Sequence, residues 1–111
     1  MDFIMFVCTD SEPDAGKEGP GEIDAWVEEG KLRGIRLQGD PFEGKSKAKT
    51  VRVRNGKLLL TDGPFAETKD WIVGYDLLKC NDIDEAVEFA SRHPMARFGR
   101  IEVRPIMIWE G

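Results

Sequence analysis

The amino-acid sequence predicts an α+β fold of the ferredoxin-like type, with the order βαββαβ and a β-hairpin inserted between the two halves. Apolar runs of strand length alternate with two helical patterns, and an Asn55-Gly56 reversal separates two further short strands. With 111 residues the chain is long enough for one hydrophobic core but not for two. We therefore expect residues 1–111 to form a single domain.

The first half begins with a strand at residues 3–8, a continuous apolar run. Residues 9–21 are rich in Asp, Glu, Gly and Pro, which predicts a solvated loop. From Glu22 the apolar residues follow an approximate helical spacing, with acids early and bases late as the helix dipole favours. This pattern predicts a helix that ends near Gly30, followed by a brief strand at Ile35 and Leu37 and a break at residues 39–41.

The middle of the chain gives the clearest local prediction, a hairpin over residues 50–61. Residues 51–54 alternate Val and Arg, Asn55-Gly56 suits the two positive φ angles of a type I′ turn, and residues 57–60 return. A second turn at residues 62–65 leads into residues 71–78, which are long, aromatic and β-branched. That composition predicts a central strand.

The last third predicts one helix and one strand. Asp82 is suited to cap the helix, with Glu85 three residues later as its capping-box partner. Pro94 disfavours helical backbone at His93, so the helix should end about there. Residues 100–109 carry the apolar pattern of a final strand.

Two short helices can cover only one face of the resulting sheet, yet its strands are apolar on both faces. In the first strand the two sets are Phe3, Met5 and Val7 against Ile4, Phe6 and Cys8. Because an uncovered apolar face of that extent marks an interface, we expect a homodimer in which two sheets pack together.

Charge and composition exclude several classes of function. The net charge of −5 and the pI near 4.9 disfavour nucleic acid as a partner. The apolar run at residues 3–8 is too short for a membrane span or a signal sequence, so we expect no membrane partner and a cytoplasmic location. Cys8, Cys80 and His93 lack the spacing of a metal site, and no phosphate-binding loop or nucleophile motif is present, so we expect neither metal nor cofactor.

Residues 62–70 hold more charged and aromatic side chains than a turn requires. Residues 61–69, together with Thr50 to Gly56 and Gly74-Tyr75, resemble the signature of the YCII-related proteins of the Asp-Gly-Pro-Phe (DGPF) type, although Asp70 stands where relatives usually have Glu. Residues 90–99 and 101–105 are similar to a second block of that family. The resemblance implies a ferredoxin-like dimeric α/β barrel without implying a reaction. Some distant relatives carry a histidine on the first helix beside an aspartate, and this chain has no histidine there.

Asp62 and His93 are the predicted catalytic pair, since Asp62 lies in the first signature block and His93, the only imidazole of the chain, lies in the second. A histidine of ordinary pKa titrates near neutral pH, and Asp62 would orient it or act as the base. The alternative is structural: Asp62 bonds the backbone of its own turn, and His93 only ends a helix.

Five further side chains are predicted to bind a ligand. Guanidinium groups pair bidentately with carboxylates and so suit an anionic small molecule, although each could instead pair with an acid of the chain. Aromatic side chains would form the wall of the pocket. The set comprises Arg52, Arg97 and Arg104 with Phe65 and Tyr75.

These observations favour a protein that binds a small organic molecule in a dimeric-barrel pocket. Cofactor-free acid–base chemistry, such as isomerisation, elimination or hydrolysis, fits the residues present. A non-catalytic ligand sensor, or an accessory protein of a transcription regulator, is the alternative. In a third interpretation the turn at residues 62–70 locks a dimer interface.

Overall fold

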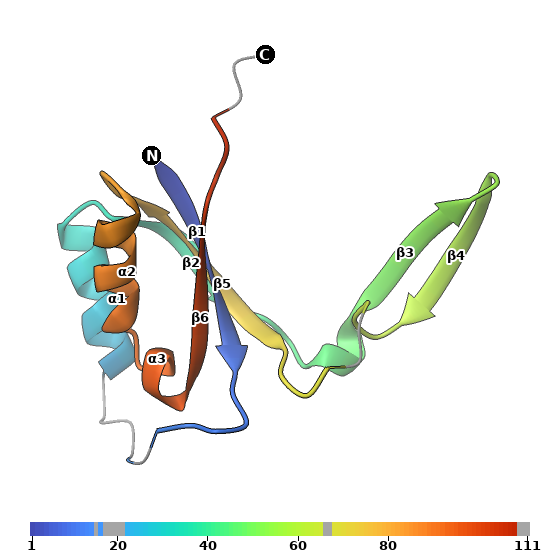
Figure 1. Ribbon diagram of the computed structural model, residues 1–111, viewed down its shortest axis with the longest axis horizontal. Coiled ribbons are helices and arrows are strands. Elements are labelled where there is room, and N and C mark those ends of the chain that lie inside the picture. The colour runs from blue at the N-terminus through green and yellow to red at the C-terminus, as the bar shows by residue number, and fades with distance from the viewer. Residues whose placement is uncertain (15, 17–21, 66–67, 109–111) are drawn as a thin grey trace.

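The computed structural model describes residues 1–14, 16, 22–65 and 68–108. It is an α+β protein with antiparallel sheets and helices, consistent with a ferredoxin-like fold (Figure 1). The elements of its body are β1 (Asp2–Thr9), α1 (Glu22–Leu32), β2 (Arg36–Pro41), β5 (Ile72–Lys79), α2 (Ile83–Ser91), α3 (Met95–Phe98) and β6 (Gly99–Pro105). No helix within these ranges is long and apolar enough to cross a bilayer.

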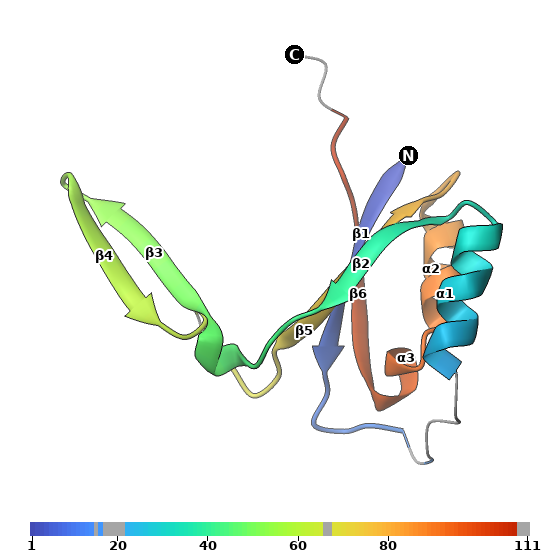
Figure 2. The ribbon, with the colours of Figure 1, turned by 180° about the vertical axis from the view of Figure 1, so that it is seen from behind.

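The main sheet has the strand order β2-β5-β1-β6, and all its neighbouring strands are antiparallel. β5 lies between β2 and β1, as its apolar sequence predicts. The register places Phe3 opposite Leu78 and Met5 opposite Val103, so these side chains share one face of the sheet. The helices cover that same face (Figures 1 and 2).

The core lies between this face and the helices. Phe3, Met5, Leu78 and Phe89 are completely buried. Trp26 on α1 stacks on Phe89 of α2 with ring centroids 4.5 Å apart, and its Nε1–H donates to the Phe89 carbonyl at 2.9 Å. Because a buried indole N–H needs an acceptor, this bond fixes how the two helices sit against each other.

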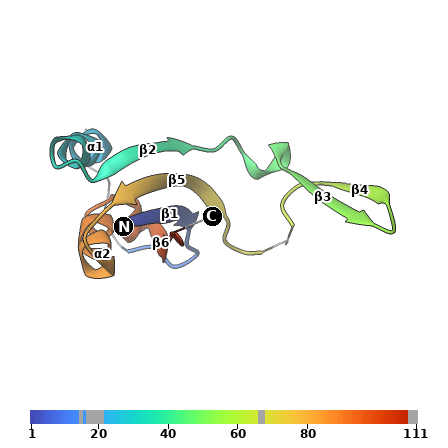
Figure 3. The same cartoon turned by 90° about the horizontal axis from the view of Figure 1, so that it is seen from above.

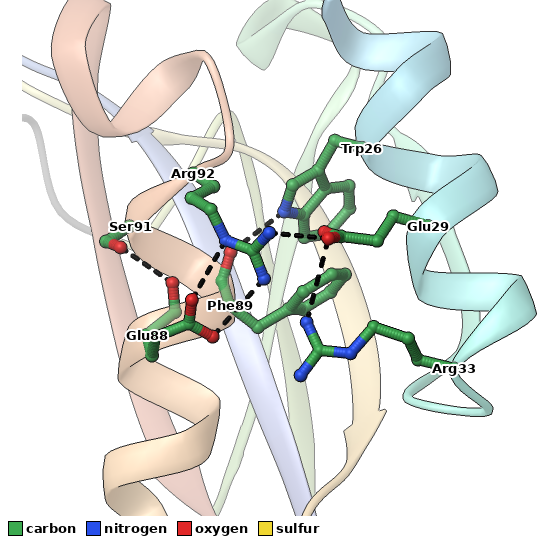
Figure 4. A network of polar contacts seen from close by, with 7 residues as sticks. All are labelled: Trp26, Glu29, Arg33, Glu88, Phe89, Ser91 and Arg92. Carbon is green, nitrogen blue, oxygen red and sulfur yellow. Dashed lines mark hydrogen bonds and ion pairs between the residues drawn. The ribbon is translucent and has the colours of Figure 1, made fainter.

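A set of polar contacts on the surface also joins α1 to α2 (Figure 4). Arg92, directly after the end of α2, binds Glu29 of α1 at 2.5 Å and Glu88 of α2 at 3.1 Å, while Arg33 approaches Glu29 at 3.8 Å. Exposed ion pairs of this kind contribute about 0–1 kcal/mol each. The buried aromatic contacts therefore hold the helices together, and the ion pairs orient their surface.

Several predicted boundaries need correction. α1 continues two residues past Gly30 and ends before Gly34, whose φ of +67° suits the left-handed position after a helix. The predicted break at residues 39–41 is wrong, because β2 runs to Pro41 and Phe42 N–H still donates to Val73 at 2.7 Å. Pro41 is tolerated because β2 is an edge strand. β6 ends at Pro105, whereas the prediction extended to residue 109, which lies outside the described residues.

The start of α2 confirms the predicted cap. The Asp82 side chain accepts from Glu85 N–H at 2.8 Å. Glu85 accepts in turn from Asn81 N–H at 3.0 Å, one residue before the position expected of a capping box.

A second, two-stranded sheet follows β2 and the short 3-10 helix η1 (Lys45–Lys47). It consists of β3 (Lys49–Arg54) and β4 (Lys57–Asp62), which pair in antiparallel register. Between them Asn55 and Gly56 have φ angles of +53° and +76°, as a type I′ turn requires. This sheet, which we call the arm, projects from the body on the side of the main sheet away from the helices (Figures 1 and 3).

Candidate functional site

A cavity of about 330 Å³ lies between α1 and the main sheet. Its apolar wall comes from β1, α1, β5 and the start of α3, and three polar side chains reach it from β2, β5 and the segment before α3. The apolar residues are Val7, Ile23, Val27, Val73 and Met95, and the polar side chains on the helix side of the sheet are Arg36, Asp76 and His93; Gly39, Asp40, Pro41, Gly74 and Tyr75 complete the lining.

Arg36 and Asp76 form an ion pair inside this cavity. The Arg36 Nε–H donates to Asp76 Oδ1 at 2.8 Å, and Nη2 donates to the Gly39 carbonyl at 2.9 Å. Burial raises the pKa of Asp76, and the charge of Arg36 opposes that rise only in part. Gly39 makes room for the carboxylate, since a Cβ at this position would lie 2.0 Å from Oδ1.

His93 is 7% exposed and is held by its neighbours on two sides. Its Nδ1 accepts from Met95 N–H at 3.0 Å, and its ring meets the Trp26 ring edge-on at 4.6 Å. Burial, and secondarily the charge of Arg36, lower the pKa of His93 to about 4. The imidazole is therefore neutral at neutral pH with its proton on Nε2, which makes it a hydrogen-bond donor. This differs from the near-neutral titration that the residue type alone suggests.

Two polar atoms of this group make no hydrogen bond within the described ranges. Within the described ranges every buried side-chain nitrogen and oxygen has a hydrogen-bond partner. Since no hydrogen bond of those ranges involves His93 Nε2 or Asp76 Oδ2, both atoms keep accessible surface. The cavity thus presents a cation, a proton acceptor and a neutral donor against an apolar wall.

The structure does not bring Asp62 and His93 together within one chain. Asp62 ends β4, its side chain is 80% exposed, and it pairs with Lys49 on the neighbouring strand. The turn that follows is tied to the base of the arm, because Gly63 N–H donates to Ala48 at 2.7 Å. Asp62 lies outside the cavity that His93 lines.

The predicted ligand-binding arginines are also dispersed. Arg52 is exposed on the arm, Arg97 binds Glu22 at 2.6 Å, and Arg104 lies 3.3 Å from Glu102 on the same strand. None of the three arginines lines the cavity.

Of the two predicted aromatic residues, Tyr75 is among the residues that border the cavity, but its side chain alternates with Asp76 and projects from the opposite face of the sheet; Phe65 does not border the cavity. The Tyr75 hydroxyl accepts from Gln38 at 3.0 Å, and its ring stacks on Phe42 at 5.8 Å. Phe65 is 91% exposed and lines a larger hollow of about 810 Å³ at the base of the arm. Lys45 lies 4.1 Å from the Trp71 ring in the same hollow.

Asp76 and Arg36 are not among the site residues predicted from the sequence. A signal for Asp76 exists, because it is the one charge within the apolar residues 71–78. A charged side chain in a buried strand needs a partner of opposite charge. Arg36, between Ile35 and Leu37, is likewise a charge between apolar neighbours and is therefore a candidate partner for Asp76. Pairing these two positions requires the β2–β5 register, which the sequence does not supply.

No group of three His, Cys, Asp or Glu side chains among the described residues is placed to hold a metal ion. In comparison with known proteins, the model of the YCII-related domain matches residues 21–110. An uncharacterized protein of Rhizobium meliloti (strain 1021) is 36% identical over 87 residues, which are 77% of this chain and 67% of that protein.

Proposed function

The chain belongs to the YCII-related family, and we propose that its cavity between α1 and the main sheet binds a small organic anion and supports proton transfer on it without a cofactor. The observation that carries the proposal is the convergence of Arg36, Asp76 and His93 on one buried, otherwise apolar cavity. Perturbed titratable groups in such a cavity are typical of functional sites.

Arg36 is the anchor for the anion. Asp76 and Gly39 engage two of its N–H groups, and other guanidinium N–H groups stay available to a carboxylate. A volume of about 330 Å³ suits a small molecule, whose hydrocarbon part would contact Val27 and Val73.

Asp76 and His93 divide the proton-transfer work. Asp76 takes a proton from the ligand, and its raised pKa makes it a stronger base than an exposed aspartate. The His93 Nε2–H donates to the oxygen on which negative charge then develops, as a neutral donor at an oxyanion site. Return of the proton to another atom gives isomerisation, and departure of a leaving group gives elimination.

We also propose that the protein is a homodimer. Ile4, Phe6, Tyr75 and Leu77 alternate with the core residues and project from the face of the main sheet opposite the helices, which we call the open face. A second copy on the open face would complete the dimeric α/β barrel that the family resemblance implies.

A thermal-shift screen at neutral pH tests ligand binding. Small carboxylic acids should raise the melting temperature of the wild type, by on the order of 10 °C at about a hundredfold excess over Kd, and their neutral amides should not. Arg36→Gln should abolish the shift, whereas Arg33→Gln, which removes an exposed guanidinium three residues earlier, should preserve it. A shift that survives in Arg36→Gln would place the ligand elsewhere.

Deuterium exchange into the bound acid separates catalysis from sensing. In D₂O, wild-type protein should exchange the hydrogen beside the carbonyl, and Asp76→Asn should bind the acid but lose the exchange. Equal exchange rates for both proteins would make the site a ligand sensor, the non-catalytic alternative.

A further inference from the structure

The arm has one apolar face that its own chain leaves exposed. The register pairs Val51 with Leu60 and Val53 with Leu58, so these four side chains project from the same face, and each is 58–65% exposed. The opposite face carries Thr50, Arg52, Arg54, Lys57, Leu59 and Thr61. An amphipathic strand pair of this kind normally packs its apolar face on another surface.

The arm cannot obtain that surface from its own body. An isolated two-stranded sheet is at best marginally stable in water. The chain has a radius of gyration of 16.2 Å, against roughly 13 Å for a compact chain of this length, because the arm stands away from the body. Its base is fixed by the Gly63 to Ala48 bond and by Thr50 Oγ1, which donates to the Gly63 carbonyl at 2.8 Å.

The direction of the arm points to the partner. Figures 1 and 3 show the helices on one side of the main sheet and the arm on the other. The arm therefore extends past the open face, the apolar surface that the helices leave uncovered. A second copy seated on the open face would lie within reach of the arm.

The charge distribution distinguishes between two ways of covering the arm. The arm (residues 49–62) contains four Lys and Arg and one Asp, whereas the rest of the chain contains twelve Lys and Arg and twenty Asp and Glu. Packing one arm on another would bring two basic segments together. Packing an arm on the body of a second copy joins segments of opposite net charge, which favours association.

We propose that two copies of this chain clasp each other, with the apolar face of each arm packed on the body of the other copy. This goes beyond the proposed sheet-to-sheet dimer and rests on it, because the second copy must first occupy the open face. Twofold symmetry makes the exchange reciprocal. The hollow at the base of the arm, lined by Phe42, Lys45, Phe65 and Trp71, is open in one chain and gains its missing wall from the second copy.

Dimer dissociation measured by analytical ultracentrifugation tests the clasp. Leu58→Thr/Leu60→Thr keeps β-propensity but removes apolar surface from the arm, and it should weaken the dimer by about tenfold or more. Leu59→Thr changes the same residue type on the opposite face and should leave the dimer unchanged. Equal dimer affinity for all three proteins would overturn the clasp, and circular dichroism would verify that the variants fold.

Two further experiments test the clasp separately from the sheet-to-sheet dimer and from the ligand site. Phe6→Glu on the open face should abolish the dimer; if it does so while the arm variant has no effect, the sheet-to-sheet dimer stands and the clasp is wrong. A photo-crosslinker at position 58, in a mixture of isotope-labelled and unlabelled copies, should capture the body of the other copy. Capture of the other copy's arm would contradict the proposal. None of these results depends on ligand binding at Arg36.

Discussion

Lowering the pH should destabilise this protein through His93. The pKa of the imidazole is about 4 in the folded chain and 6.5 in the unfolded chain. Between these values the unfolded chain binds more protons, so the free energy of unfolding falls as the pH falls from about 6.5 to about 4. Once the pH lies below both pKa values, the free energy of unfolding has fallen by roughly 3 kcal/mol through this group.

Urea unfolding of the wild type and of His93→Asn, from about pH 7 to about pH 4, isolates this contribution. An Asn side chain can still accept from Met95 N–H but does not titrate. The wild type should lose on the order of 2–3 kcal/mol more than the variant over this range. Burial raises the pKa of Asp76, which acts in the opposite direction in both proteins and cancels in the comparison.

The pKa of His93 can be measured directly by NMR. His93 is the only histidine of the chain, so its imidazole resonances need no assignment. A midpoint near 4 is expected in an NMR titration of the folded protein. A midpoint near 6.5 would refute the argument, because it would mean that neither burial nor Arg36 affects the ring.

Two other changes test how the site and its scaffold are built. Gly39→Ala should lower the free energy of unfolding, measured with urea, by about 1–3 kcal/mol, because the added Cβ meets the Asp76 carboxylate. Gly44→Ala is the control and should be near neutral, because the added carbon there meets nothing within 4 Å. Equal losses of stability in the two variants would show that the Asp76 carboxylate does not require glycine at position 39. Asp82→Ala should remove the cap bond to Glu85 N–H and lower stability by about 1 kcal/mol, and an unchanged urea midpoint would show that the cap contributes nothing.

Local chemistry made much of the fold predictable from the sequence. Asn55-Gly56 specifies its turn through backbone angles, and Asp82 specifies a helix start through one side-chain bond. The extent of β2 was not predictable in this way, because Gly39 and Pro41 usually mark turns. Here the edge position of β2 tolerates Pro41, and the Asp76 carboxylate requires Gly39. Both reasons depend on the neighbouring strand.

The site was less predictable because it depends on contacts between distant segments. Arg36 and Asp76 are 40 residues apart and meet only through the β2–β5 pairing. Asp62 and His93 were predicted as a pair because both lie in the signature blocks. The structure places one on the exposed arm and the other in a buried cavity. The lowered pKa of His93 likewise depends on burial, which the residue type does not reveal.

The proposal that the Arg36–Asp76–His93 cavity binds a small organic anion is tested most directly by the His93 imidazole resonances during a ligand titration. The carboxylic acid that most stabilises the wild type should shift these resonances saturably, with the same Kd that the thermal shifts give. In Arg36→Gln the resonances should not move. Stabilisation of the wild type without any change at the imidazole would contradict the account, because the acid would then bind outside this cavity.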